Sequence, residues 1–360
     1  MKNRLLALLA IGVFAFAGLV NAANTYHVAS YTELMDALGA AQPGDTIIVT
    51  DDITIPADTT TEKYAPIQIQ KDNITVQAEG DVTVYGTGSK VVFLIGAAWE
   101  FDPDTSSYTS KRISGVTVEG FNIEGGDIGV LIKEADNCTV RNLTITESSE
   151  GIRLIDASGC TIENNTIDVA ADGIGIFLQN SGTNANRGAG TGNTLSGNTV
   201  TGSGLGLFIF ESTGNVVDGD RYSNNGNGGV VLNDSTGNVL QNLTVNLNEG
   251  WGVRFVFADE NQLLTSVIRD NSWGGVELLA STGNLVEGNI VYNNGTADDG
   301  SDDAQIVITH GDKEVYTTEV FGEYNRLGDL SEFVEEKFRI YDKLDLLWWW
   351  VEEVDVELWD

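Results

Sequence analysis

Residues 238–260 read NVLQNLTVNLNEGWGVRFVFADE, and residues 261–283 read NQLLTSVIRDNSWGGVELLASTG. Each begins with an asparagine, has an apolar residue two places later, and continues with a short apolar run, a glycine and a second apolar run. From Cys138 onward the same pattern recurs, mostly in steps of 22 or 23 residues. Self-similarity at such a period predicts a solenoid, whose coils bury their apolar side chains against one another.

The first position of the repeat forms a column in the sequence. Its members are Cys138, Cys160, Asn193, Asn215, Asn238, Asn261, Asn284 and Asn325. The two longest steps contain the polar segments 181–192 and 296–303, which we expect to be loops that leave one edge of the stack. Asparagines one strand spacing apart can hydrogen-bond their amides from coil to coil, so we expect a structural ladder.

Each coil is expected to contain three short strands. A corner between the first and second strands is indicated by residue types that tolerate positive φ: Asn142, Asn164, Gly197, Gly219, Asn242, Thr265 and Gly288. A turn before the third strand ends at Gly151, Gly173, Gly206, Gly229, Gly252 or Gly275. Alternation then predicts the inward pairs Ile152/Leu154, Ile174/Ile176, Leu207/Ile209, Val230/Leu232, Val253/Phe255 and Val276/Leu278.

The remaining side chains of the third strand should point outward in columns. The first column is expected to be Leu131, Arg153, Gly175, Phe208, Val231, Arg254 and Glu277. The second is expected to be Lys133, Ile155, Phe177, Phe210, Asn233, Val256 and Leu279. The position after it is expected to hold Glu134, Asp156, Leu178, Glu211, Asp234, Phe257 and Ala280.

Both ends of the stack need caps. Residues 31–41 form an amphipathic pattern that predicts a capping helix, and residues 330–341 predict a second short helix before an aromatic strand at 346–351. The predicted fold is therefore all-β: a single-stranded right-handed parallel β-helix with an N-terminal capping helix and a short C-terminal helix–strand cap. The expected divisions are a signal peptide at 1–22, the β-helix with its N-terminal cap at 23–330, and a C-terminal cap or tail at 331–360.

The first residues have the parts of a secretory signal peptide: Lys2 and Arg4, an apolar run at 5–20, and Ala22 before the expected cut. We expect a secreted, periplasmic or cell-surface protein without a transmembrane segment after cleavage. The alternative is an uncleaved membrane anchor, for which the apolar run is short. Loss of two positive charges would take the formal charge from −34 to −36, which argues against nucleic acid and anionic lipid as partners.

Histidine is too sparse for several kinds of chemistry. The chain has only His27 and His310, which argues against Ser-His-Asp hydrolysis and multi-histidine zinc or copper centres.

The segments ELMDAL at 33–38 and PGDTI at 43–47, together with the repeats, resemble the pectate-lyase-like superfamily and its parallel β-helix repeats. Residues 333–342 are similar to the end of periplasmic NosD-like proteins. The resemblance implies a carbohydrate partner, but this fold also hosts lyases, hydrolases, epimerases, adhesins and non-enzymes. The chain lacks the Gly-His-Gly set of polygalacturonases and the Asp-Pro-His signature of mannuronan epimerases. NosD-like proteins are linked to copper-enzyme maturation, yet His, Met and Cys are too few here to suggest copper ligands.

Lys133 and Arg153 would project from adjacent coils beside Glu134 and Asp156. Uronate lyases of the superfamily have a similar arrangement, in which Ca²⁺ on acidic groups neutralises the sugar carboxylate while Lys or Arg removes the adjacent proton. The resemblance makes Lys133 and Arg153 catalytic candidates and makes Glu134 and Asp156 candidate Ca²⁺ ligands. No other cofactor is indicated. The alternative is a lattice of ion pairs between neighbouring coils.

A second candidate site combines Trp251 and Trp273, expected in equivalent turns, with Arg254 and Glu277. Exposed aromatic rings along a groove could stack on sugar faces, so these residues are candidates for substrate binding. The alternative is that the two charges pair with each other and the tryptophans close the edge of the sheet.

Two further features remain open. Cys138 and Cys160, in consecutive coils of one column, could form a disulfide or remain two buried thiols. The outward face around Phe177 and Phe210 is unusually apolar, so we expect a cover, either the tail from about Leu344 or self-association. In the first case at least two of the tryptophans in 348–350 would be buried.

The leading functional hypothesis is an exported β-helix that binds a polysaccharide or cell-surface glycan and could act on it as a polysaccharide lyase or glycoside hydrolase. The alternative is a non-enzymatic structural or adhesive surface protein that uses the solenoid as a spacer and assembly face.

Overall fold

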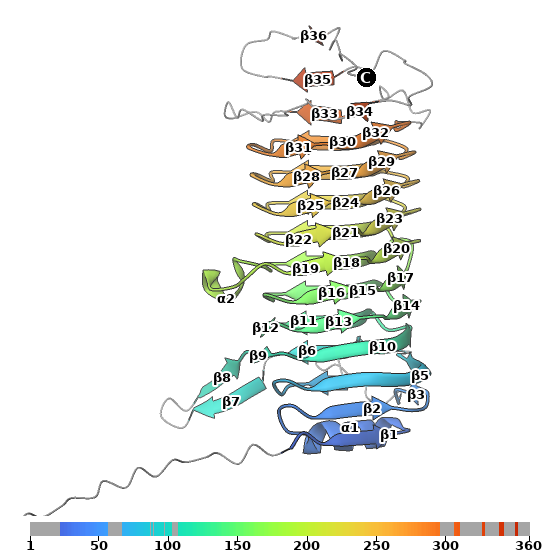
Figure 1. Ribbon diagram of the computed structural model, residues 1–360, viewed down its shortest axis with the longest axis vertical. Helices are drawn as coiled ribbons and strands as arrows, with labels where there is room; N and C mark the ends of the chain where they lie inside the picture. Colours follow the sequence, from blue (N-terminus) through green and yellow to red (C-terminus); the bar gives the residue numbers. More distant parts are fainter. Residues whose placement is uncertain are drawn as a thin grey trace, which may run out of the picture.

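The chain forms one elongated stack of coils (Figure 1). The computed structural model describes residues 22–56, 67–86, 88, 90–96, 98–102, 107–295, 306–309, 326–327, 338–341 and 350–351. Residues 1–21 of the expected signal peptide lie outside these residues. The insert at 296–303 and Asn325 also lie outside them. No helix within the described residues is both long and apolar enough to cross a bilayer.

The regular coils each contain three strands, as predicted. First strands are β13 (Thr139–Arg141), β16 (Thr161–Glu163), β19 (Thr194–Ser196), β22 (Val216–Asp218), β25 (Val239–Gln241), β28 (Gln262–Leu264) and β31 (Leu285–Glu287). Second strands are β14 (Thr144–Thr146), β17 (Thr166–Asp168), β20 (Thr199–Thr201), β23 (Arg221–Ser223), β26 (Thr244–Asn246), β29 (Val267–Arg269) and β32 (Ile290–Tyr292). Third strands are β11 (Ile128–Lys133), β15 (Glu150–Ile155), β18 (Ile174–Gln179), β21 (Leu205–Phe210), β24 (Gly228–Asn233), β27 (Trp251–Val256) and β30 (Gly274–Leu279).

The earlier coils are less regular. Their strands are β1 (Thr25–Val28), β2 (Thr46–Val49), β3 (Ile53–Thr54), β4 (Ile67–Ile69), β5 (Thr75–Tyr85), β6 (Val91–Gly96), β9 (Ile113–Ser114), β10 (Thr117–Glu124) and β12 (Ala135–Asp136). An antiparallel hairpin, β7 (Ala98–Asp102) and β8 (Ser107–Lys111), leaves the stack after β6. The four-residue helix α2 (Ala185–Gly188) lies in the expected loop at 181–192. Hairpin and helix both project from the same side of the stack in Figure 1.

Strands pair in parallel from coil to coil, so equivalent residues form columns along the stack. The third strands belong to a 12-stranded sheet, while the first and second strands join in a 20-stranded sheet that bends at each corner. The corner residues have positive φ as predicted, for example 55° at Asn142, 56° at Asn242 and 72° at Gly219. A single left-handed residue is therefore enough to turn the chain from one strand to the next.

The asparagine column is a continuous buried ladder. The side-chain amide of each residue donates to the side-chain carbonyl of the next, at 2.9 Å for Asn193–Asn215 and 3.0 Å for Asn215–Asn238 and Asn238–Asn261. The last step, from Asn261 to Asn284, measures 3.3 Å. Each amide also donates to a backbone carbonyl of the preceding coil, as Asn238 does to Ser212 at 3.1 Å. The predicted ladder is confirmed for the five members from Asn193 to Asn284.

Periodicity did not single out the other buried polar columns. Three of their members, Asn165, Asn198 and Asp220, follow the first corner. A longer ladder after the second strands contains Asn225, Asn248, Asn271 and Asn294. Serine hydroxyls accept backbone N–H groups after the third strands, at Ser181, Ser212, Ser235 and Ser281. Buried backbone donors at the turns are satisfied in this way by the neighbouring coil.

The expected register is wrong in one coil. Ile152 and Leu154 pair with Ile176 and Leu178, because five residues separate β17 from β18 where three separate β14 from β15. The glycine equivalent to Gly151 is therefore Gly175, where a Cβ would lie 2.2 Å from Val200 Cγ1. The corrected members of this coil are Ile176 and Leu178 inward, Phe177 and Gln179 in the two outward columns, and Asn180 after them.

The N-terminal cap matches its prediction. Helix α1 (Tyr31–Ala40) begins at Ser30, whose hydroxyl accepts the Glu33 N–H at 3.3 Å, while the Glu33 carboxylate accepts the Ala29 N–H at 2.8 Å. This reciprocal cap fixes the first turn. Leu34, Ala37 and Leu38 are buried against the first coils, so the helix closes the end of the core.

The C-terminal end differs from its prediction. β33 (Ile306–Thr309) continues the 12-stranded sheet, and β34 (Arg326–Leu327) continues the other. Residues Phe338–Tyr341, expected to be helical, form strand β35 on β33 because their β-forming side chains extend an open sheet edge. β36 (Trp350–Val351) pairs antiparallel with β35, so this part of the tail lies at the end of the sheet, and the expected cover over the Phe177 and Phe210 face stays a prediction. The burial of Trp348, Trp349 and Trp350 is a prediction that lies outside the described residues.

The ladder predicts a stability difference between two asparagines. We expect Asn238→Ala to lower the free energy of unfolding by about 2–4 kcal/mol, because it leaves the backbone N–H and one side-chain N–H of Asn215 without a partner in the core and removes the bonds from Asn238 to Ser212 and Asn261. The matched control is Asn242→Gly at an exposed position with φ of 56°, which should cost less than about 1 kcal/mol. Urea unfolding measures both, and equal losses would contradict the role of the buried ladder.

Candidate functional site

The outer face of the 12-stranded sheet carries the outward columns on which the sequence placed both candidate sites. With the corrected register, the first outward column from β11 to β30 is Leu131, Arg153, Phe177, Phe208, Val231, Arg254 and Glu277. The second is Lys133, Ile155, Gln179, Phe210, Asn233, Val256 and Leu279.

Three phenylalanines at the centre of this face form a phenylalanine platform: Phe177, Phe208 and Phe210. The rings of Phe177 and Phe208 are stacked with centroids 5.0 Å apart, and those of Phe208 and Phe210 are 5.9 Å apart. Phe177 is only 8% exposed, whereas Phe208 and Phe210 are half-buried. Parallel pairing at successive coils thus aligns aromatic faces along the stack.

Arg153 borders the platform at β15. Its guanidinium lies 4.6 Å from the centre of the Phe177 ring, and its Nη2 donates to Gln179 at 2.8 Å. Its Nη1 pairs with Glu150 at 3.2 Å. Burial raises the pKa of Glu150 above its ordinary value, although Arg153 acts in the opposite direction. The Arg153 guanidinium therefore contacts Phe177, Gln179 and Glu150 and is not free to bind another anion.

A second ion pair lies beyond Val231, two coils from Phe208. Arg254 of β27 pairs with Glu277 of β30, and the Glu277 side chain is only 12% exposed. Trp251 and Trp273 are not equivalent: Trp251 pairs with Gly274, where a Cβ would lie 2.1 Å from the indole ring. Trp273 lies one position before the equivalent of Trp251 in the next coil, and it is 49% exposed.

The four residues considered for uronate chemistry do not converge. Lys133 lies beside Ile155 in the second outward column, whereas Arg153 lies beside Leu131 and Phe177 in the first. Glu134 and Asp156 occupy the left-handed position at the end of the strand, with φ of 50° and 49°. The structure accordingly brings Arg153 to Glu150 and Phe177, and brings Asp156 to a residue that the sequence analysis did not consider.

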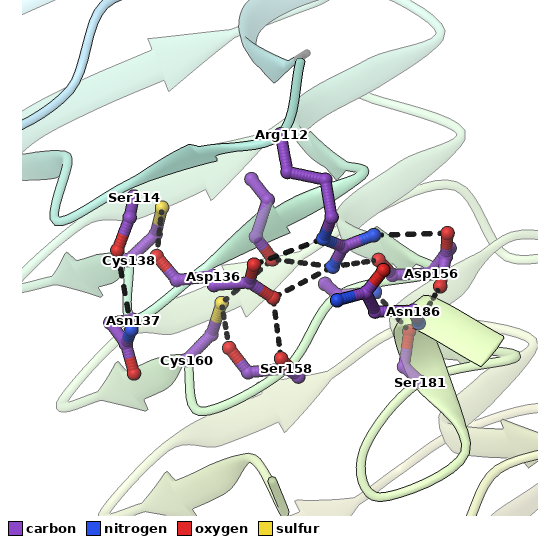
Figure 2. Close-up of polar contacts among 12 residues, drawn as sticks. Arg112, Ser114, Asp136, Asn137, Cys138, Asp156, Ser158, Cys160, Ser181 and Asn186 are labelled. Atoms are coloured by element: carbon purple, nitrogen blue, oxygen red, sulfur yellow. Dashed lines mark hydrogen bonds and ion pairs between the residues drawn. The ribbon is translucent and has the colours of Figure 1, made fainter. Parts of the chain in front are cut away.

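That residue is Arg112, which follows the β7–β8 hairpin. Figure 2 shows its guanidinium between the carboxylates of Asp136 and Asp156. Nε and Nη2 bind the two oxygens of Asp136 at 2.9 and 2.7 Å, and Nη1 binds Asp156 at 3.0 Å. The other Asp156 oxygen accepts the backbone N–H of Asn186 in α2 at 2.6 Å. One guanidinium thus ties the hairpin to two coils, and Asp156 ties α2 to the same point.

The electrostatics of this cluster follow from its partial burial. The Arg112 side chain is 17% exposed. Burial lowers its pKa, but the hydrogen bonds and charges of Asp136 and Asp156 outweigh that effect and raise it. Burial likewise raises the pKa of Asp136, while hydrogen bonds from Arg112 and Ser158 bring it below its ordinary value. Only the spatial proximity of three coils reveals this cluster, since Arg112 and Asp156 are 44 residues apart.

Cys138 and Cys160 lie next to this cluster as two buried free thiols (Figure 2). Their Sγ atoms donate to backbone carbonyls of Asp136 at 3.3 Å and Ser158 at 3.5 Å. The hydrogen bond with Cys138 and burial together raise the pKa of Cys160 well above its ordinary value. The thiols therefore occupy the asparagine column as small core residues.

The described residues do not bring three potential metal ligands together. They contain no group of three or more His, Cys, Asp or Glu side chains arranged around a common point. Both oxygens of Asp156, one of the expected Ca²⁺ ligands, are already taken by Arg112 and Asn186. Oxygen-rich, unneutralised groups are what Ca²⁺ needs, so Glu134 and Asp156 as placed here do not fit it.

One buried carboxyl has an unusual environment. Asp220 accepts hydrogen bonds from the Asn198 amide at 3.1 Å and the Tyr222 hydroxyl at 2.7 Å. Burial raises its pKa from 3.8 to about 6 despite these donors. It stands in the ladder of Asn165 and Asn198, where an asparagine could also fit.

Two family models match the sequence. Residues 173–320 match a right-handed β-helix region, and residues 66–186 match a family described as periplasmic copper-binding protein (NosD). The described residues contain no cluster of side chains that would suit the copper named in that description, and their two cysteines are buried in the core. Comparison with curated protein sequences gives no match.

Several solved structures share the fold. The A-module of mannuronan C-5 epimerase AlgE4 from Azotobacter vinelandii is 13% identical with a TM-score of 0.56, over 87% of this chain and 94% of that one. DFA-IIIase from Arthrobacter chlorophenolicus A6, in complex with GF2, is 14% identical with a TM-score of 0.53, over 86% and 94%. The tailspike of E. coli bacteriophage HK620, in complex with a hexasaccharide, is 10% identical with a TM-score of 0.54, over 80% and 57%. At these identities the likeness establishes the fold alone.

The Arg112 cluster predicts that one arginine matters for stability and another does not. We expect Arg112→Met to lower the free energy of unfolding by about 2–4 kcal/mol, since two partly buried carboxylates lose their cation. The control is Arg141→Met, whose side chain is 41% exposed although it also pairs with two carboxylates, and it should cost less than about 1 kcal/mol. Similar losses in thermal and urea unfolding would contradict the structural role of Arg112.

Asp220 predicts a pH dependence with a defined sign. Its folded-state pKa of about 6 exceeds the ordinary 3.8, so its contribution to stability is complete below pH 3.8 and lost as the pH rises through about 6. The loss amounts to roughly 3 kcal/mol, at about 1.4 kcal/mol per pKa unit. Asp220→Asn should therefore gain stability relative to the unchanged chain between pH 4 and pH 7. Parallel stability curves for the two proteins would show that Asp220 does not titrate in this way.

Proposed function

Because this chain belongs to the right-handed parallel β-helix superfamily, we propose that it is an exported protein that binds a polysaccharide or cell-surface glycan on the outer face of its 12-stranded sheet. One observation carries the proposal: the phenylalanine platform lies on this face with two of its rings half-buried. A sugar ring has an apolar face of C–H groups, so a row of aligned aromatic rings is a suitable surface for a linear glycan.

The geometry of the face supports an extended ligand rather than a small molecule. Equivalent residues repeat at each coil, about 4.8 Å apart along the stack, so the surface is long and regular. The ion pair Glu150–Arg153 borders the platform at one end, and the pair Arg254–Glu277 lies beyond Val231 at the other. An extended chain of repeating units is the ligand that such a repeating surface matches.

The compared proteins support a carbohydrate ligand by analogy. Those of similar fold include a mannuronan epimerase and a tailspike in complex with a hexasaccharide. Export is part of the proposal because the leader-like sequence at 1–22 precedes a β-helix and a periplasmic family matches residues 66–186.

The arrangement of side chains on this face supports binding of a glycan better than cleavage of its bonds. The residues considered for catalysis, Lys133 and Arg153, project in different columns. Arg153 is held by Glu150 and Gln179, and Asp156 by Arg112. A structural surface protein, the other hypothesis from the sequence, would use the same face to meet a protein or a second copy.

The test is affinity electrophoresis of the full chain in gels that contain individual polysaccharides. We expect retardation by at least one polymer and a loss of about tenfold in affinity for Phe208→Ala, which removes an aromatic contact worth about 1.4 kcal/mol. The control is Phe257→Ala, since Phe257 is 57% exposed but lies outside the platform. Absence of binding to every polymer, or equal effects of the two variants, would refute glycan binding at this face.

A further inference from the structure

The charges around the phenylalanine platform limit which glycans can bind there. Both arginines of the outward columns are engaged within the protein: Arg153 by Glu150 and Arg254 by Glu277. The strand ends beside the platform carry Asn180, Glu211 and Asp234, all exposed, so this edge has two carboxylates and no cation. Within the described residues, neither Glu211 nor Asp234 forms an ion pair.

The chain as a whole is negatively charged, like the edge beside the platform. The formal net charge is −34, and no compensating basic patch lies on the platform itself. A polyuronate carries one negative charge per sugar, so its approach to this edge would be opposed, most strongly at low salt. Lys133, the other cation of the outward columns, lies three coils away from Phe208 along the stack.

The two polar side chains that flank Phe210 in the second outward column are uncharged. In the second outward column Phe210 lies between Gln179 on one neighbouring strand and Asn233 on the other. Gln179 uses its side-chain oxygen to accept from Arg153, and its side-chain N–H groups donate to no described residue. The Asn233 side chain makes no hydrogen bond to any described residue. An aromatic ring between two amides offers stacking for a sugar face and donors and acceptors for hydroxyl groups.

We propose that the platform binds an uncharged glycan, with sugar rings on Phe208 and Phe210 and hydroxyl groups on the amides of Gln179 and Asn233. This inference rests on the proposed function and names the substrate class of the same site. It differs from a polyuronate, which would need free cations at the platform. It also differs from a second copy of this chain, whose equally acidic face would bring Glu211 and Asp234 against like charges.

The experiment compares neutral polymers (a β-glucan, a galactomannan and an inulin-type fructan) with polyuronates (alginate and polygalacturonate). Binding of the full chain is measured by affinity electrophoresis and calorimetry at low and physiological salt. We expect at least one neutral polymer to bind at least tenfold more tightly than either polyuronate, with an affinity that salt changes by less than twofold.

Two variants test the amides. Asn233→Ala and Gln179→Ala should each weaken binding of the neutral polymer about five- to tenfold. Gln262→Ala, an outward-facing amide on the other sheet, is the matched control and should leave binding unchanged. Circular dichroism confirms that each variant keeps its fold.

The outcomes distinguish failure of glycan binding from failure of the uncharged substrate class. Tighter binding of a polyuronate, weakened by salt, would overturn the uncharged substrate class while leaving glycan binding in place. Binding of no polymer would overturn both. Concentration-dependent dimers that Phe208→Ala dissociates, without glycan binding, would identify the platform as a contact between copies and also overturn both.

Discussion

The stack depends on satisfying polar backbone groups at its buried turns. Each coil bends several times around an apolar core, and every bend interrupts the strand pairing that would otherwise use the N–H and C=O groups. Asparagine solves this with one donor and one acceptor on a short side chain, as Asn215 does by accepting from Asn193 and donating to Asn238. Because each link needs the next coil at the correct height, the ladder also fixes the register.

The fixed register of the third strands decides which side chains lie next to one another on the outer face. When Ile176 and Leu178 follow Ile152 and Leu154 inward, Phe177 is placed outward next to Phe208. A shift by one residue would bury Phe177 and expose its apolar neighbours. The phenylalanine platform is therefore a consequence of the same hydrogen bonds that hold the core.

The insertions are held to the solenoid by charge rather than by the ladder. Arg112 joins the coils of Asp136 and Asp156 beneath the β7–β8 hairpin, and Asn186 of α2 binds the same Asp156. A partly buried guanidinium with three bonds to carboxylates specifies one orientation. Asp156, outward and acidic in the sequence pattern, thus makes a structural contact with Arg112 and Asn186.

The sequence by itself determined the solenoid, its three-strand coils, the capping helix and the asparagine ladder, because these depend on residue types repeated at a fixed period. Gly219 and Asn238 carry that information locally, through permitted φ and through an amide that must be paired when buried. The sequence also placed Phe177, Phe208 and Phe210 on the outer face, but only the tertiary structure decided how their rings pair and that the Arg112 cluster forms. Two extra residues in one turn moved Phe177 from the second outward column to the first, beside Phe208, and no periodicity records a turn length before the strands are paired. Arg112 meets Asp156 only because coils distant in sequence lie one above another, and side-chain contacts across such distances depend on the stacking itself.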